Sequence, residues 1–336
     1  MGSVEQGLQP AIDLVGAACA TWPLLGRWRS RVAASRRVQS VLDVVRSPSF
    51  RRKAQAAIVL VFVTFIGLAV YRNWSDLQAY EWRADVRYPL LAFAAFPLAY
   101  LSNAWCWHRI ISRVSTQEGV RANAHIYFLS SLGRYVPGGI WHIAGRAYWY
   151  RDRGVPGYQV VVASVWENTI VVVSGLIVYA LLTPGLEILG GAAAVISTLV
   201  LPAVLNRVVG GAGKKLGLRS GSVRALDVVV LYGLIGVAWA VGGGILWLVI
   251  NAAFPLEVAA APAVIAAWGL AGAVGMVAGV LVGGLGIREI TIGALLAQIV
   301  PVPVAMIAAI GFRLVVTASE MVWALALSWL TGRKIE

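Results

Sequence analysis

The segment Gly133 to Arg146, GRYVPGGIWHIAGR, holds two arginines and a Pro-Gly-Gly break inside an otherwise apolar chain. Pro137 removes a backbone donor, and the two glycines after it permit unusual dihedral angles, so backbone amides there are free to bind a ligand. Guanidinium groups donate paired hydrogen bonds to phosphate oxygens. We therefore expect Arg134 and Arg146 to form an anion pocket. His142 either contacts a lipid headgroup there or is an interfacial histidine with satisfied hydrogen bonds. The alternative is a cytoplasmic turn whose arginines only follow the distribution of charge across a membrane.

A second segment, GGLGIRE from Gly283 to Glu289, places Arg288 and Glu289 at the start of a short helix. The amino end of a helix attracts anions and tolerates an acidic side chain in its first turn. We expect Arg288 to bind a headgroup phosphate while Glu289 caps the helix or pairs with a cation.

Three further charges, Glu167, Arg313 and Glu320, lie inside apolar stretches. Each costs about 2.5–3.5 kcal/mol in a membrane if it is unpaired. Glu167 follows Gly139 by 28 positions and Arg313 follows Gly284 by 29, which indicates an internal repeat with ionisable residues at matching positions. The repeat predicts that Glu167 and Arg313 pair across the centre of the domain. These residues either take part in transport or, more simply, form a structural ion pair that holds two helices together.

Composition sets the class of protein. Of 336 residues, 59% are hydrophobic and 13% are charged, and the mean hydropathy is +0.77, which is typical of a polytopic membrane protein. No soluble catalytic domain fits, and no nucleophile, paired carboxylate, metal-ligand or cofactor motif is present, so we expect no enzyme, metal or cofactor. The net charge of +13 lies at the ends of apolar runs, which favours a membrane surface over nucleic acid as the partner.

A membrane-spanning helix needs about 20 mostly apolar residues. Seven stretches qualify: Ala54–Tyr71, Tyr88–Ile111, Tyr158–Leu182, Leu186–Leu205, Leu226–Ile250, Val258–Leu281 and Pro303–Leu330. Two shorter ones, Ala122–Leu132 and Ile287–Val300, adjoin the breaks and predict re-entrant helices. The fold expected is all-α, with about seven or eight transmembrane helices, two broken segments and an internal repeat.

The chain divides into a basic segment, 1–53, and a membrane domain, 54–331. The first segment has nine basic and three acidic residues, which predicts a cytoplasmic amino terminus in the plasma (inner) membrane. It forms either an interfacial amphipathic helix or a disordered tail. The side of the carboxyl terminus depends on the number of spans, and the oligomeric state, including a homo-oligomer, is left open.

These motifs together resemble the lysylphosphatidylglycerol synthetase/flippase-like transmembrane family. The matching stretches are GRYVPGGIWHIAGR, the WEN at 166–168, GGLGIRE and the GFR at 311–313, and the resemblance covers roughly residues 55 to 330. It implies a stand-alone flippase-type domain without the aminoacyl-transferase half that some members carry.

The expected function is therefore a lipid flippase that moves a phospholipid or a polyprenyl-phosphate-linked glycolipid between leaflets. Its substrate-binding residues would be Arg134, His142, Arg146, Glu167, Arg288, Glu289, Arg313 and Glu320. The alternative is a non-transporting scaffold, or accessory subunit, for a cell-envelope glycosyltransferase or lipid synthase.

Overall fold

The computed structural model describes residues 85–115, 118–135, 141–216, 223–282 and 286–332, with four isolated positions before them. Across these ranges the regular elements are helices and none is a strand, which confirms the predicted all-α fold. Several predicted features lie outside the described residues: the basic segment 1–53, the span Ala54–Tyr71 apart from its isolated positions, and the glycine breaks at 137–139 and 283–284.

Within the described residues, six helices are long and apolar enough to cross a membrane, as a multi-pass membrane protein requires. They are α6 (Arg87–Val114), α9 (Gly157–Leu182), α10 (Glu187–Leu216), α11 (Ala225–Asn251), α12 (Ala261–Val282) and α14 (Val302–Gly332). Each matches one of the spans predicted from hydropathy. A short 3-10 turn, η2 (Val258–Ala260), precedes α12.

Three other α-helices are too short to cross. They are α7 (Val120–Ser131), α8 (Trp141–Arg151) and α13 (Ile287–Leu296), with 12, 11 and 10 residues. A 3-10 turn, η1 (Leu132–Tyr135), ends α7. The predicted short segment at 122–132 is thus helical and that at 287–300 is helical as far as Leu296, where α13 ends. The helix α8 was not predicted, because its mixture of aromatic, basic and small residues lacks a continuous apolar run.

Contacts between helix ends show which ends lie together. Arg113 Nη2 is 2.5 Å from Asp227 Oδ1, which joins the end of α6 to the start of α11. Arg121 of α7 donates a hydrogen bond of 2.7 Å to the Leu330 carbonyl oxygen of α14. At the opposite end of the bundle, the Asp85 amide donates to the Ala252 carbonyl oxygen. We call the end that holds Arg113, Arg121 and Leu330 the basic end.

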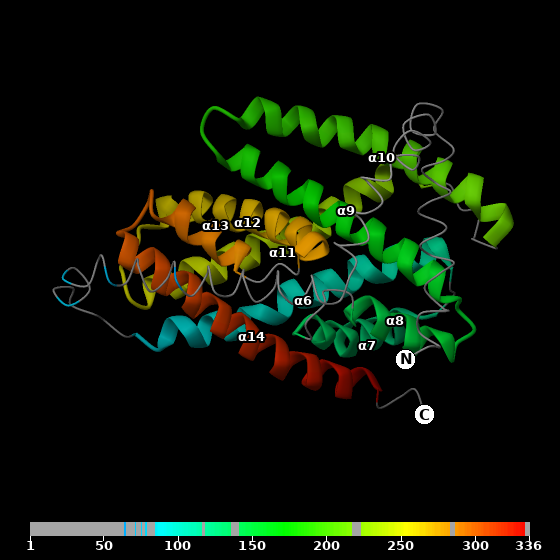
Figure 1. Ribbon diagram of the computed structural model, residues 1–336, viewed down its shortest axis with the longest axis horizontal. Coiled ribbons are helices and arrows are strands. Elements are labelled where there is room, and N and C mark those ends of the chain that lie inside the picture. The colour runs from blue at the N-terminus through cyan, green and yellow to red at the C-terminus, as the bar shows by residue number, and fades with distance from the viewer. Residues whose placement is uncertain are drawn as a thin grey trace, which may run out of the picture.

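The three short helices, together with α12, form two hairpins that enter the bundle from opposite ends. The first hairpin, α7 and α8, starts at the basic end and returns to it, where Arg153 meets Glu118 at 3.8 Å. The second hairpin, α12 and α13, starts at the opposite end, since η2 follows Ala252 closely, and leads into α14, which runs back to the basic end. In Figure 1, α7 and α8 accordingly lie to the right and α13 to the left. Oppositely oriented broken elements are a recurring feature of membrane transporters.

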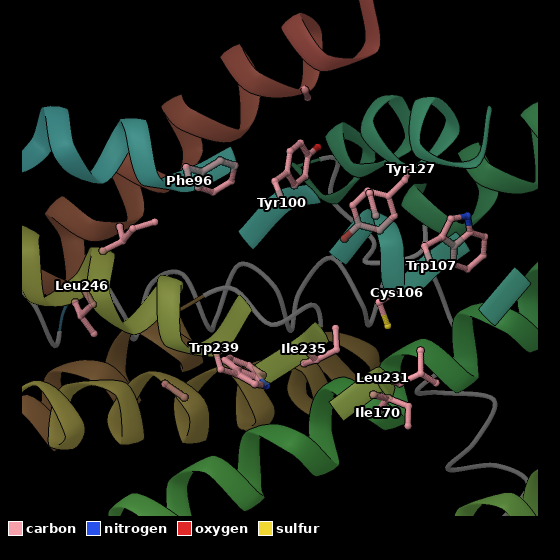
Figure 2. Close-up of a cluster of buried hydrophobic side chains, with 14 of the residues drawn as sticks. Phe96, Tyr100, Cys106, Trp107, Tyr127, Ile170, Leu231, Ile235, Trp239 and Leu246 are labelled. Carbon is pink, nitrogen blue, oxygen red and sulfur yellow. The ribbon is translucent and has the colours of Figure 1, made fainter. Parts of the chain in front are cut away.

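Aromatic side chains fill the space between the first hairpin and α6. Trp107 and Tyr127 are buried, and Figure 2 shows them close together, with Trp239 of α11 further along the same core. Trp107 Nε1 donates 3.0 Å to Tyr150 Oη, and that hydroxyl donates 2.5 Å to Asn123 Oδ1. Because these bonds join α6, α7 and α8, they fix the first hairpin against the bundle.

Close helix crossings depend on glycine. A Cβ on Gly269 of α12 would lie 2.9 Å from the Gly175 carbonyl oxygen of α9, and one on Gly133 would lie 2.8 Å from the His142 amide nitrogen. Small residues at such crossings let helix backbones approach in a membrane. A Cβ on Gly275 of α12 would lie 2.9 Å from Arg288 Cβ, so α12 and α13 are closely packed there.

We predict that Gly269→Ala lowers the thermal stability of the detergent-solubilised protein. The added methyl group overpacks the crossing of α9 and α12, at a cost of about 1–3 kcal/mol, which exceeds the gain in helix propensity. The matched control is Gly233→Ala in α11, where a Cβ meets nothing within 4 Å. Equal melting temperatures for the two variants would contradict this account of the crossing.

Candidate functional site

The first component of the site is a buried ion pair between α8 and α9. Arg146 is fully buried, and its Nη1 donates to Glu167 Oε2 while Nη2 lies 3.5 Å from Oε1. The guanidinium carbon lies 4.0 Å from the Trp107 ring centroid and 4.8 Å from that of Tyr127. Such cation–π contacts and an ion pair together compensate the charge that burial would otherwise make costly. Arg146 therefore holds Glu167 in place and presents no surface to a headgroup.

The second component has the same design with the charges exchanged. Arg313 of α14 places Nη1 2.9 Å from Glu289 Oε1 of α13, and Arg288 Nη2 lies 3.4 Å from the same oxygen. In the first component the short helix supplies the arginine and the long helix the glutamate. Here the short helix supplies the glutamate and the long helix supplies the arginine.

The predicted pairing of Glu167 with Arg313 is therefore wrong. Glu167 pairs with a residue 21 positions earlier, and Arg313 with one 24 positions earlier. The physical reason is that each short helix lies against the long helix that follows it, so complementary charges meet within one half of the chain.

A third pair joins the two halves. Arg134 Nη1 lies 3.4 Å from Glu320 Oε1, and the Tyr135 hydroxyl donates a hydrogen bond of 2.8 Å to Glu320 Oε2. Arg134 also donates from Nη2 to the Tyr127 hydroxyl at 3.1 Å. The tip of the first hairpin is thus bound to α14, and the carboxyl oxygens of Glu320 each have a partner.

These elements enclose a cavity of about 340 Å³ near the middle of the long helices. Six of the eight site residues predicted from the sequence line it: Arg134, His142, Glu167, Arg288, Arg313 and Glu320. The other two, Arg146 and Glu289, lie behind the wall and pair with residues that line it. All eight predicted residues therefore form one cluster, to which both broken segments contribute.

Sequence reasoning missed the tryptophans and neutral polar groups in the wall. Trp239 and Trp268 line the cavity, together with Asn103, Asn168 and Thr317. A Cβ on Gly272 would lie 2.4 Å from the Trp239 ring, and one on Gly242 would lie 2.3 Å from Trp268 Nε1, so glycines make room for both indoles. The two tryptophans could have been identified from their position in the middle of predicted spans, because tryptophan in membrane proteins is usually enriched at the water interfaces.

Several polar atoms of cavity-lining residues are buried without a partner. They are His142 Nδ1, Trp268 Nε1 and Arg288 Nε. An unpartnered buried donor costs about 1–3 kcal/mol, and a ligand acceptor would recover that cost. Two of the three, the indole and the guanidinium nitrogens, can only donate. The wall is therefore suited to a ligand rich in acceptor oxygens.

Within the described ranges, no three His, Cys, Asp or Glu side chains come together as metal ligands. A scan of the chain against protein-family models gives no match, and a search of curated proteins finds none either. The resemblance to the flippase-like family thus rests on the quoted motifs, and the site is argued from its geometry.

We predict that Glu167→Gln destabilises the protein far more than Arg134→Gln. The first change leaves the Arg146 charge buried without a counter-ion, at a cost of about 3–5 kcal/mol. The second removes a longer pair whose arginine side chain is 39% exposed, and the buried Glu320 keeps its hydrogen bond from Tyr135, so the loss is about 1 kcal/mol. Thermal melting in detergent, followed by size-exclusion chromatography, measures the difference, and similar losses for both variants would refute the ranking.

Proposed function

We propose that this protein is a lipid transporter that moves a phosphate-bearing lipid between the leaflets of a membrane. The observation that carries the proposal is the cavity between the two hairpins, where Arg134, Arg288 and Arg313 line one space among apolar helices. Arginine suits phosphate because its planar guanidinium donates two parallel hydrogen bonds to the oxygens.

The arrangement addresses the main barrier to lipid translocation, which is the cost of moving a charged headgroup through hydrocarbon. In the proposed mechanism the headgroup enters the polar cavity while its chains remain in the bilayer. Arg134 and Arg313 exchange part of their contact with Glu320 and Glu289 for phosphate oxygens, so charge stays compensated during passage. The resemblance of the sequence motifs to a flippase-like family supports the same function.

The proposal is tested by reconstituting the purified chain in vesicles that contain a chain-labelled fluorescent phospholipid. Loss of fluorescence to a membrane-impermeant reductant reports movement between leaflets. We expect Arg134→Ala to slow this movement about tenfold or more, since a charge-assisted hydrogen bond is worth about 1.5–3 kcal/mol. Arg151→Ala is the matched control, because that side chain is 72% exposed and contacts Asp152 and the Tyr148 ring away from the cavity.

Two outcomes would count against the proposal. If Arg134→Ala and wild type move lipid equally fast, the cavity is not the route. If wild type is no faster than empty vesicles, transport itself fails, and the scaffold alternative gains support, with co-purification of an envelope-biosynthesis enzyme as its own test.

We further propose that the chain lies in the plasma (inner) membrane with its basic end in the cytoplasm. Arg113, Arg121 and Arg153 lie at this end, whereas the opposite end carries Asp85 and Glu257, and an excess of basic residues marks the cytoplasmic side. Because α14 ends here, a fluorescent protein fused to the carboxyl terminus should fluoresce and a phosphatase fused there should be inactive. An active phosphatase would reverse the orientation.

A further inference from the structure

The cavity has an unequal number of opposite charges. Among the described residues, four arginines and three glutamates lie in its wall or directly behind it. They are Arg134, Arg146, Arg288 and Arg313, with Glu167, Glu289 and Glu320. Each glutamate has one arginine as its nearest cation, so the wall retains a single positive charge.

The excess charge is located on Arg288. Its nearest acceptor, Glu289 Oε1, is 3.4 Å away and is shared with Arg313, which is closer at 2.9 Å. Arg288 Nε is buried without a hydrogen-bond partner. No other arginine of the cluster combines a shared counter-ion with an unsatisfied donor.

Packing holds Arg288 ready for a ligand. Its stem lies against Gly275, where a Cβ would be only 2.9 Å from Arg288 Cβ, and its guanidinium carbon is 5.3 Å from the Trp268 ring centroid. A cation that is already positioned loses little side-chain freedom when a ligand binds. Since Arg288 lines the cavity, this position places a fixed positive charge against the bound headgroup.

We infer that the site selects a headgroup with a net charge of minus one, namely a phosphodiester whose remaining groups are uncharged. The inference rests on the proposed transport function and specifies its substrate class. In surroundings of low dielectric constant an uncompensated charge is costly, so the occupant that neutralises the wall binds best. A zwitterionic headgroup leaves the wall positive, whereas a phosphomonoester, at about −1.5 to −2, overcompensates it.

The uncharged part of the headgroup also has partners in the wall. Asn103, Asn168 and Thr317 line the same cavity and can exchange hydrogen bonds with hydroxyl groups. A polyol or a sugar fits these groups, whereas an amine would find the oxygens of the two glutamates that line the cavity, Glu167 and Glu320, already bound to arginine or tyrosine. Two lipid classes share the resulting chemistry: a glycerophospholipid with a polyol headgroup and a polyprenyl monophosphate-linked sugar.

The test measures equilibrium binding of short-chain lipids to the purified full chain in a neutral detergent, by quenching of tryptophan fluorescence. The probes are phosphatidylglycerol, phosphatidylcholine, phosphatidic acid and a short polyprenyl monophosphate-linked sugar. We expect one or both of the phosphodiester monoanions to bind about tenfold tighter than phosphatidylcholine and phosphatidic acid. The stronger of the two identifies the lipid class.

Variants that change the charge of the wall provide the decisive comparison. Arg288→Gln removes the excess charge and should abolish the tenfold preference over phosphatidylcholine, while Arg288→Lys keeps the charge and should retain the preference. Glu320→Gln leaves Arg134 without its carboxylate, so the preference should move toward phosphatidic acid. Size-exclusion profiles matching wild type show that each variant is folded.

A rank order of affinities that is the same in wild type, Arg288→Gln and Glu320→Gln would overturn the inference. Equal binding of all the phospholipids to wild type would also overturn it. If wild type then moves them all between leaflets, the transport proposal stands and only the selectivity fails. Transport failure alone is distinguishable, because vesicles then show no lipid movement while the charge-dependent binding order is kept.

Discussion

The structure depends on keeping charge compensated inside a bundle of apolar helices. The buried pair of Arg146 and Glu167 shows how this is done, since the guanidinium is held by a carboxylate on one side and by the rings of Trp107 and Tyr127 on others. The buried side chains of the short helix α8 are Arg146 and Tyr150, so this pair and the Tyr150 hydrogen bonds define its position. One wall of the cavity follows from that position.

In the second half of the described chain, the charges of α13 and α14 are paired in the same way, but the short helix carries the glutamate and the long helix carries the arginine. Arg146 with Glu167 and Arg313 with Glu289 are paired within their own halves, whereas Arg134 has its carboxylate partner, Glu320, in the other half. The carboxylate of Glu289 serves both Arg288 and Arg313. It leaves the meeting point of the halves positively charged, which is the property that a site for an anionic group requires.

Much of this could be predicted from the sequence because hydropathy is a local property. All six long helices in the described part of the chain follow from runs of apolar residues. Three of the eight predicted site residues, Glu167, Arg313 and Glu320, were selected because charge inside such runs is rare, and the other five because they adjoin the glycine breaks. The pairing could not be predicted, since residue spacing does not tell on which side a short helix returns. Arg146 shows the same limit, because its burial depends on Trp107 and Tyr127, which come from two other helices.

The contact of Arg134 and Tyr135 with Glu320 is, among the ion pairs of the described cluster, the one that crosses between the halves. It is long and partly exposed to the cavity, so separating it costs little, whereas the pair of Arg146 and Glu167 stays closed within its own half. The two halves are nevertheless packed closely together, with α9 against α12 and α7 against α14. Opening the contact between Arg134 and Glu320 would therefore change the charges that line the cavity without removing the packing that joins the halves.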